Sequence, residues 1–230
     1  MSILDSLLAT IAPLDCIVCN QENCLLCTAC TPLLGAYVPS RCFSCYTPTQ
    51  THATCVACSK AAPIASVVPT YVYTALAKQL VAEFKFGGKR SGAKDMARLM
   101  QLPRYHMTTI LVHIPTATTR VRSRGYDHAK LLTRALSHNV GLVHVSALAR
   151  TTQGRQVGLG RAQRTVNMQE AFRVVLPDMV KGAHVVLVDD VVTTGATLAS
   201  AARALLQAGA LRVDAAVFAQ APRGSLDIKV

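Results

Sequence analysis

The stretch Val185-Val-Leu-Val-Asp-Asp-Val-Val-Thr-Thr-Gly-Ala-Thr197 decides the fold of this 230-residue chain. Its apolar run, Val185–Val188, is typical of a central parallel strand that is buried on both faces. Asp189 and Asp190 follow at the carboxyl end of this strand, and a Thr/Gly turn leads into a helical pattern over Leu198–Ala208. Because ligands bind at the carboxyl ends of the strands in open α/β sheets, this stretch predicts a ligand site.

The turn after the Asp pair has the composition of a phosphate cradle. Backbone N–H groups, hydroxyls and the start of a helix attract an anion, and Gly195 lets the chain pass close to it. The predicted phosphate-binding residues are Val192, Thr193, Thr194, Gly195, Ala196 and Thr197. Asp189 and Asp190 are then placed to accept hydrogen bonds from sugar hydroxyls or to hold Mg²⁺, so a 5-phosphorylated ribose fits. The alternative is an ordinary strand–turn–helix with a chance pair of carboxylates. The Walker A pattern is absent.

The remainder of the chain after residue 62 alternates between strand and helix patterns. The expected strands are 67–73, 109–114 and 212–218, and the expected helices are 75–86, 93–102 and 126–139. This alternation predicts an α/β domain whose mostly parallel sheet is flanked by helices. We place its boundaries at residues 63–230.

All nine cysteines lie between Cys16 and Cys58, and eight of them form C-x-x-C pairs. Two such pairs complete a tetrahedral Zn²⁺ site. We assign one structural zinc to Cys16, Cys19, Cys27 and Cys30, and a second to Cys42, Cys45, Cys55 and Cys58. Spacing alone leaves open a cross-braced pairing, and iron–sulfur, redox or disulfide chemistry are alternatives of lower weight. Residues 1–62 are therefore predicted to be a small zinc-binding module.

The charge is unevenly distributed. The formal net charge is +12, which two Zn²⁺ ions bound by eight thiolates would reduce to about +8. Nine basic residues and one acid, Asp127, lie between Arg120 and Arg164. Such a block favours an anionic partner, a phosphorylated small molecule or a nucleic acid, over a merely solubilising surface. No run reaches the ~18 apolar residues of a membrane span, and no basic segment precedes the apolar N-terminal residues. We therefore expect a soluble, cytoplasmic protein.

Residues 185–197 resemble the phosphoribosyl pyrophosphate (PRPP) signature of type I phosphoribosyltransferases. Together with the cysteine pairs, further stretches make the chain similar to the ComF/GntX group, whose members join N-terminal zinc knuckles to this domain. The supporting stretches are 84–88, 122–129, 150–159 and 164–172. The resemblance covers about residues 16–218.

The resemblance implies a type I phosphoribosyltransferase fold, PRPP and Mg²⁺ as ligands, and a role in natural competence. ComF proteins are associated with uptake of single-stranded DNA across the inner membrane. By motif, Asp189 and Asp190 would be the catalytic pair at the ribose hydroxyls. The segment after Pro115 would be a mobile loop near the pyrophosphate. Candidates for pyrophosphate or DNA binding are Lys85, Arg120, Arg122 and Arg124.

Three functions follow as alternatives. The first is a competence protein that binds PRPP and single-stranded DNA. Its zinc module would contact proteins of the uptake machinery, and only these partners would bring it to the inner membrane. The second is a binding module in which the PRPP pocket acts as a sensor or phosphate site and the basic block grips single-stranded DNA. The third is a salvage phosphoribosyltransferase with a structural zinc appendage. Little chain follows the strand that ends at Phe218, so a base pocket would have to come from residues 70–105 or the zinc module.

Overall fold

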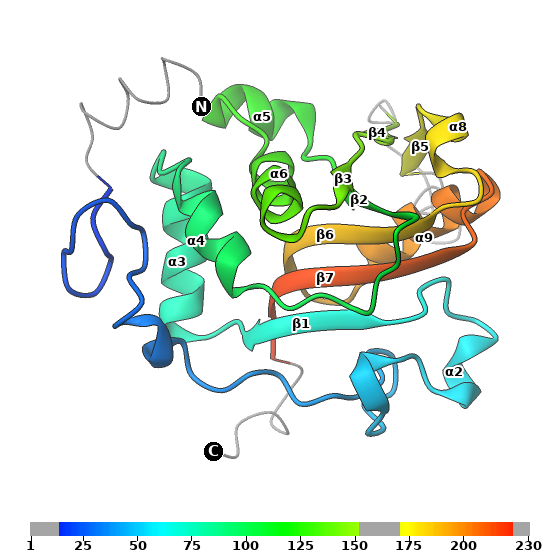
Figure 1. Cartoon of the computed structure of the whole chain (residues 1–230), viewed down its shortest axis with the longest axis horizontal. Helices are drawn as coiled ribbons and strands as arrows, with labels where there is room; N and C mark the ends of the chain where they lie inside the picture. The colour runs from blue at the N-terminus through cyan, green and yellow to red at the C-terminus, as the bar shows by residue number, and fades with distance from the viewer. Residues whose placement is uncertain (1–13, 152–170, 223–230) are drawn as a thin grey trace, which may run out of the picture.

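The computed structural model describes residues 14–151 and 171–222. Its centre is a five-stranded parallel sheet in the order β1-β7-β6-β2-β3 (Figure 1). The strands are β1 (Val67–Val72), β2 (Thr109–His113), β3 (Val143–His144), β6 (His184–Val192) and β7 (Arg212–Gln220). The type I phosphoribosyltransferase fold expected from the sequence is confirmed.

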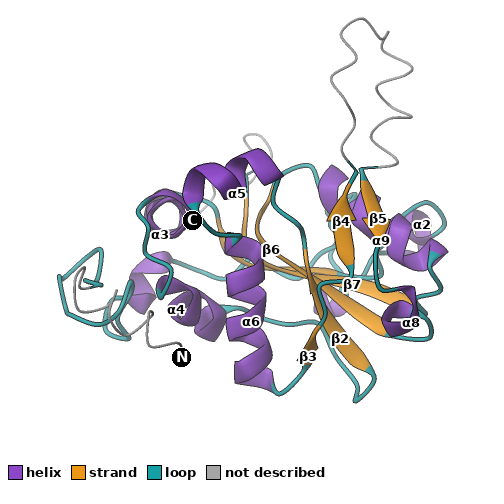
Figure 2. Cartoon of the chain, turned by 90° about the horizontal axis from the view of Figure 1, so that it is seen from above, coloured by secondary structure: helices purple, strands orange, loops and turns teal. Residues whose placement is uncertain are grey.

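Helices cover both faces of the sheet. On one face, α3 (Ala75–Phe86), α4 (Gly92–Leu99) and α6 (His128–Val140) pack on Val186 and Val188 of β6 (Figure 2). On the other face, α9 (Ala196–Gln207) packs on Val185 and Leu187. Successive residues of β6 therefore enter opposite cores, which explains its unbroken apolar run.

The predicted elements agree with the observed ones except at their ends. α4 stops three residues before the predicted end, because the Gln101 N–H donates to Thr70 Oγ1 at 2.9 Å and the chain turns toward β1. α6 starts two residues later than predicted because the Asp127 carboxylate caps it, accepting from the Lys130 N–H at 3.2 Å. β6 continues through the Asp pair to Val192, paired with β7.

Several short elements were not predicted. The basic segment after Pro115 was expected to be a loop, and it contains the helix α5 (Thr118–Arg124), which ends at Gly125 in the left-handed conformation. An antiparallel hairpin of β4 (Leu148–Arg150) and β5 (Phe172–Val174) is followed by α8 (Pro177–Val180). The motif residues between these two strands, 152–170, lie outside the described residues.

The cysteine-rich segment packs directly on the sheet and its helices. It contains the short helices η1 (Thr31–Leu34), η2 (Gln50–His52) and α2 (Val56–Ser59). Leu25 and Leu26 are fully buried in the same core as α3 and α4, and the Leu25 N–H donates to Asp95 of α4 at 2.6 Å. Tyr37 forms a bridge to Tyr71 of β1, and Ala53 forms one to Ser66, the residue before β1, so this segment covers an edge of the sheet. The domain boundary at residue 62 stays a prediction.

Candidate functional site

Asp190 is the centre of a charged cluster at the carboxyl end of β6. Only 2% of the residue is exposed, and its carboxylate contacts two cationic or ionisable side chains from different helices. Lys85 Nζ, from the last turn of α3, lies 2.7 Å from Asp190 Oδ2, and His128 Nε2, from the first turn of α6, lies 3.0 Å from the same oxygen. A buried carboxylate is thus neutralised by partners far away in sequence.

His128 has polar neighbours at both ring nitrogens. Its Nδ1 lies 3.2 Å from Arg124 Nη1 and 3.3 Å from Thr116 Oγ1, and its Nε2 lies 3.0 Å from Asp190 Oδ2. Asp127, which precedes His128, accepts from both the N–H and the hydroxyl of Thr116 and holds the end of β2 against α6.

The two carboxyl groups of the Asp pair differ in their pKa. Burial raises the pKa of Asp189 to about 8, and the neighbouring charge of Asp190 adds to the effect. Burial also opposes ionisation of Asp190, but the hydrogen bond from His128 and the charge of Lys85 outweigh it and lower the pKa of Asp190. As the pH rises, Asp190 therefore ionises before Asp189.

Arg150 brings another cation toward the pair. Its Nε donates to the carbonyl of Pro115 at 2.7 Å, and its charge favours ionisation of Asp189. Burial lowers the pKa of Arg150, and Asp189 counteracts that effect. The Arg150 guanidinium, at the end of β4, therefore interacts with residues at the carboxyl ends of both β2 and β6.

The predicted phosphate turn lies between β6 and α9. Gly195 has φ +77°, in the left-handed region that favours glycine, and caps the start of α9, whose first residues are Ala196 and Thr197. A pocket of about 410 Å³ beside the turn is lined, among the described residues, by Thr193, Thr194, Ala221 and Pro222.

The second cysteine cluster contributes a wall to this turn. The Phe43 ring, from the knuckle Cys42–Cys45, lies so close to Gly195 that an added Cβ would overlap it. Three residues further on, Tyr46 Oη accepts a hydrogen bond of 2.5 Å from Gln220 at the end of β7. The turn is therefore bounded by residues from opposite ends of the chain.

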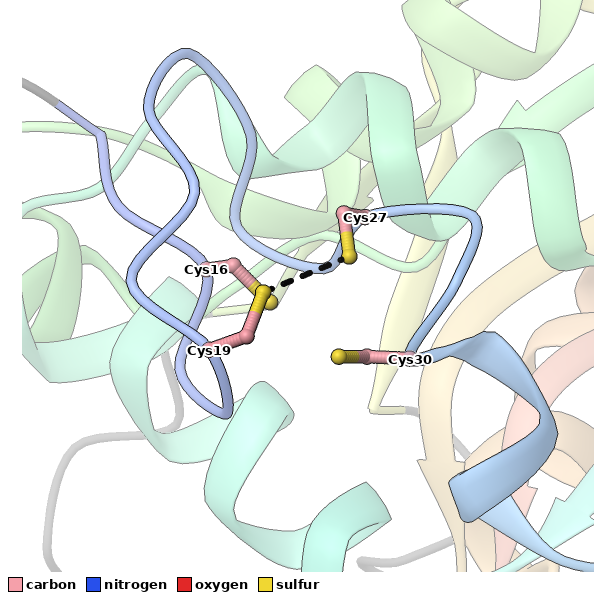
Figure 3. Close-up of side chains that lie close together, drawn as sticks. All are labelled: Cys16, Cys19, Cys27 and Cys30. Atoms are coloured by element: carbon pink, nitrogen blue, oxygen red, sulfur yellow. Dashed lines mark hydrogen bonds between the residues drawn. The ribbon is translucent and has the colours of Figure 1, made fainter.

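The eight paired cysteines form two clusters, grouped as predicted. Cys16, Cys19, Cys27 and Cys30 make one (Figure 3), Cys42, Cys45, Cys55 and Cys58 the other, and within each cluster the sulfurs lie within 4.8 Å of one another. The distances Cys19–Cys27 and Cys45–Cys55, 3.6 and 3.4 Å, are too long for disulfides. They are close to the ~3.8 Å between sulfurs of a tetrahedral site with Zn–S bonds of about 2.3 Å. The clusters therefore fit structural zinc.

The remaining candidates are distributed differently. Lys85 contacts Asp190 directly, and Arg124 contacts His128, which in turn contacts Asp190. Arg120 and Arg122 are exposed on α5. Sequence reasoning left His128 without an assigned role and did not select Arg150 or Phe43. His128 and Arg150 lie within the stretches that resemble the ComF/GntX group, so this resemblance was the sequence signal that could have identified them.

Comparison with known proteins agrees with this architecture. Residues 120–229 match the family model described as a phosphoribosyl transferase domain. YhgH of Escherichia coli K12, a DNA utilization protein, is 33% identical over 176 residues, covering 72% of this chain and 77% of YhgH. Competence protein ComFC of Bacillus subtilis is 26% identical over 198 residues, covering 80% and 79%. Competence protein F of Haemophilus influenzae is 29% identical over 141 residues, covering 56% and 62%.

The fold and the matching model define a phosphoribosyltransferase-domain protein. Within that class, the chain belongs to the ComF family. Within the described residues, no helix is long and apolar enough to cross a membrane.

Proposed function

We propose that this protein binds PRPP with Mg²⁺ at the carboxyl end of β6 and handles single-stranded DNA during natural transformation. The observation that carries the proposal is the juxtaposition of the Asp189–Asp190 pair with the glycine turn at the start of α9. Two structural zinc ions hold the cysteine clusters. The protein acts in the cytoplasm and reaches the uptake machinery at the inner membrane through protein partners of the cysteine-rich segment.

The proposed binding mode assigns each part of PRPP to a set of residues. The 5-phosphate lies on residues 193–197, where the helix start and hydroxyls favour an anion. The ribose hydroxyls donate to Asp189 and Asp190, and Arg150 faces the pyrophosphate. Asp189 and Asp190 would hold Mg²⁺, which would stabilise the negative charge of the leaving pyrophosphate.

If the protein turns over, the bond between ribose C1 and the pyrophosphate oxygen breaks, and its electron pair leaves with pyrophosphate. The acceptor then forms the new bond to C1. The carboxylate of Asp190 stabilises positive charge developing on the sugar ring, and Arg150 and Arg124 stabilise charge on the leaving group.

The DNA part of the proposal rests on charge and on the relatives. Arg120 and Arg122 project from α5 at the same edge as the Asp pair, and two of the relatives are named competence proteins. Contacts to phosphates make the affinity for DNA fall with salt, so replacing Arg120, Arg122 and Arg124 by Ala should reduce the salt slope. An unchanged slope would remove this surface from the DNA interface.

The PRPP assignment is tested by calorimetry on zinc-loaded protein with Mg²⁺-PRPP, with and without a short single-stranded DNA. We expect binding by the wild type and none by the double variant Asp189→Asn with Asp190→Asn. Asp178→Asn, an exposed acid on α8, is the matched control and should keep wild-type affinity. Retained affinity in the double variant would refute the site. Turnover with a free base and no response to DNA would favour the salvage alternative.

A further inference from the structure

The phenyl ring of Phe86 is exposed to solvent at the edge of the candidate site. It lies two residues after Phe84 on α3, so the two rings point to different sides of the helix: Phe84 is fully buried and Phe86 is 71% exposed. Several large apolar side chains of the described residues are exposed, and Phe86 is the one that directly follows Lys85, the partner of Asp190.

The ring of Phe86 is paired with an arginine that is itself fixed. The Arg124 guanidinium carbon lies 4.4 Å from the centroid of Phe86, which is a stacking distance, and Arg124 Nη1 is hydrogen-bonded to His128. A contact path therefore runs from Phe86 through Arg124 and His128 to Asp190. The ring lies two side chains away from the carboxylate assigned to the ribose.

The surroundings of Phe86 are basic. The α3–α4 turn and the end of α5 lie side by side (Figure 2): Arg90 Nη2 donates to the Gly125 carbonyl at 3.4 Å and its guanidinium lies 4.9 Å from the Tyr126 ring centroid. We name this surface the basic platform. It consists of Phe86, Lys89, Arg90 and Arg124, with Arg120 one turn before Arg124 on α5. The acid paired to it is Glu83, which lies 3.3 Å from Lys89.

A cationic surface with one exposed ring fits an unpaired nucleotide. Arginines and lysines hold the backbone phosphates, and the ring and guanidinium plane accept an unstacked base, whatever its identity. Double-stranded DNA offers no free base face and would use the charges alone.

We propose that the basic platform binds single-stranded DNA with one base stacked on the face of the Phe86 ring away from Arg124, next to the ribose site. The proposal rests on the proposed function and deepens it, because it names the side chain that contacts a base of the bound strand.

The test uses the absence of tryptophan from the sequence. Phe86→Trp keeps an aromatic face and supplies a single fluorophore, whose emission a stacked base quenches. We expect quenching on titration with a short oligo-dT, and little on titration with the same backbone lacking bases. Tyr105→Trp, at an exposed ring before the amino end of β2, is the matched control and should not respond.

Affinities complete the test. The wild-type protein should bind oligo-dT about tenfold more tightly than the abasic strand, and Phe86→Leu, which keeps the apolar volume, should lose this preference. Equal quenching by the abasic strand, or a preference for bases that survives in Phe86→Leu, would overturn the stacking proposal. If the wild type binds neither strand, the DNA part of the proposed function fails, which is a separate result.

Discussion

At the scale of single residues, the fold stabilises ionisable groups by pairing them with partners from other elements. Asp190 is buried with Lys85 and His128, and Asp214 is buried at the opposite end of the sheet with Arg212 and His184. The Arg212 guanidinium and the Ser66 hydroxyl hold the pKa of Asp214 below its usual value despite burial, which raises it. Each carboxylate avoids the large cost of an unpaired buried charge.

His113 lies at the end of β2, and no carboxylate of the described residues is in direct contact with it. It is buried, and its Nδ1 lies 3.0 Å from His144 Nε2 on β3, so only one of the two facing nitrogens can carry a proton. Burial lowers the pKa of His113 to about 4; the charges of His144, Lys130 and Arg134 act in the same direction, and Asp127 opposes them.

This histidine should make stability depend on pH. In the unfolded chain it binds a proton near pH 6.5, and in the folded protein only near pH 4. The unfolded state therefore binds more protons between these values, and the free energy of unfolding falls as the pH falls. Between pH 7.5 and 5.5 the contribution is about 1 kcal/mol.

Urea unfolding at these two pH values measures the effect as a difference between variants. His113→Gln should show a smaller loss of stability than the wild type by about 1 kcal/mol. His138→Gln, an exposed histidine on α6, serves as the control and should behave as the wild type does. Using differences cancels any contribution of the cysteine clusters. Equal pH dependence in all three proteins would contradict the assignment.

At the scale of elements, the two cysteine clusters face different parts of the α/β fold. The first buries Leu25 and Leu26 against α3 and α4, and the second places Phe43 against Gly195 of the phosphate turn. The first cluster therefore serves the core, and the second serves the candidate site.

Removing the Phe43 ring should weaken PRPP binding more than it weakens the fold. Without this wall the glycine turn samples more conformations, and ordering it on binding costs more free energy. For Phe43→Ala we expect the Kd for Mg²⁺-PRPP, measured by calorimetry, to rise about tenfold, or ~1.4 kcal/mol. Ile17 follows the first cysteine of its own cluster as Phe43 follows Cys42, so Ile17→Ala is the matched control.

The expected control result separates the two clusters. Ile17 packs against the core of α3 and α4, so its truncation should lower the unfolding temperature and leave PRPP affinity within about twofold of the wild type. A Kd for Phe43→Ala that matches the Ile17→Ala value would show that the second cluster does not shape the turn.

The elements also show what the sequence could predict. The helix 75–86 was predicted at its observed bounds because its apolar spacing is regular and Gly87 follows it. The helix α5 was not predicted because Thr118–Arg124 contains one apolar residue, Val121, and so has no helical periodicity. The Asp pair and the cysteine grouping were read from local motifs.

The remaining contacts of the site join residues far apart in sequence. Lys85 reaches Asp190 over 105 positions, and Phe43 meets Gly195 only because the cysteine-rich segment folds back on the sheet. Local patterns identify residue types at such positions but do not specify which of them meet, since that depends on how helices pack over a sheet.

At the scale of the whole molecule, the cysteine-rich segment and the α/β region share one core. Cys16, Cys27 and Cys30 are buried in the same cluster as Leu80 of α3 and Met96 of α4. Binding of zinc by the first cluster would therefore be coupled to the folding of α3 and α4, which lie far along the chain.

Chelation of zinc should consequently loosen α3 and α4 and not only residues 14–58. Loss of the metal leaves four close thiols without the ion that holds them together, and Leu25 and Leu26 lose the backbone that presents them to the core. Hydrogen exchange on zinc-loaded protein, before and after a strong chelator, should show protection falling in α3 and α4 while the amides of β6 and β7 respond less.

The variant Cys55→Ser, which opens the second cluster, is the comparison and should leave α4 protected. If α3 and α4 keep full protection after verified removal of both metals, the shared core does not depend on zinc, and the cysteine-rich segment is an appendage to a self-sufficient α/β domain.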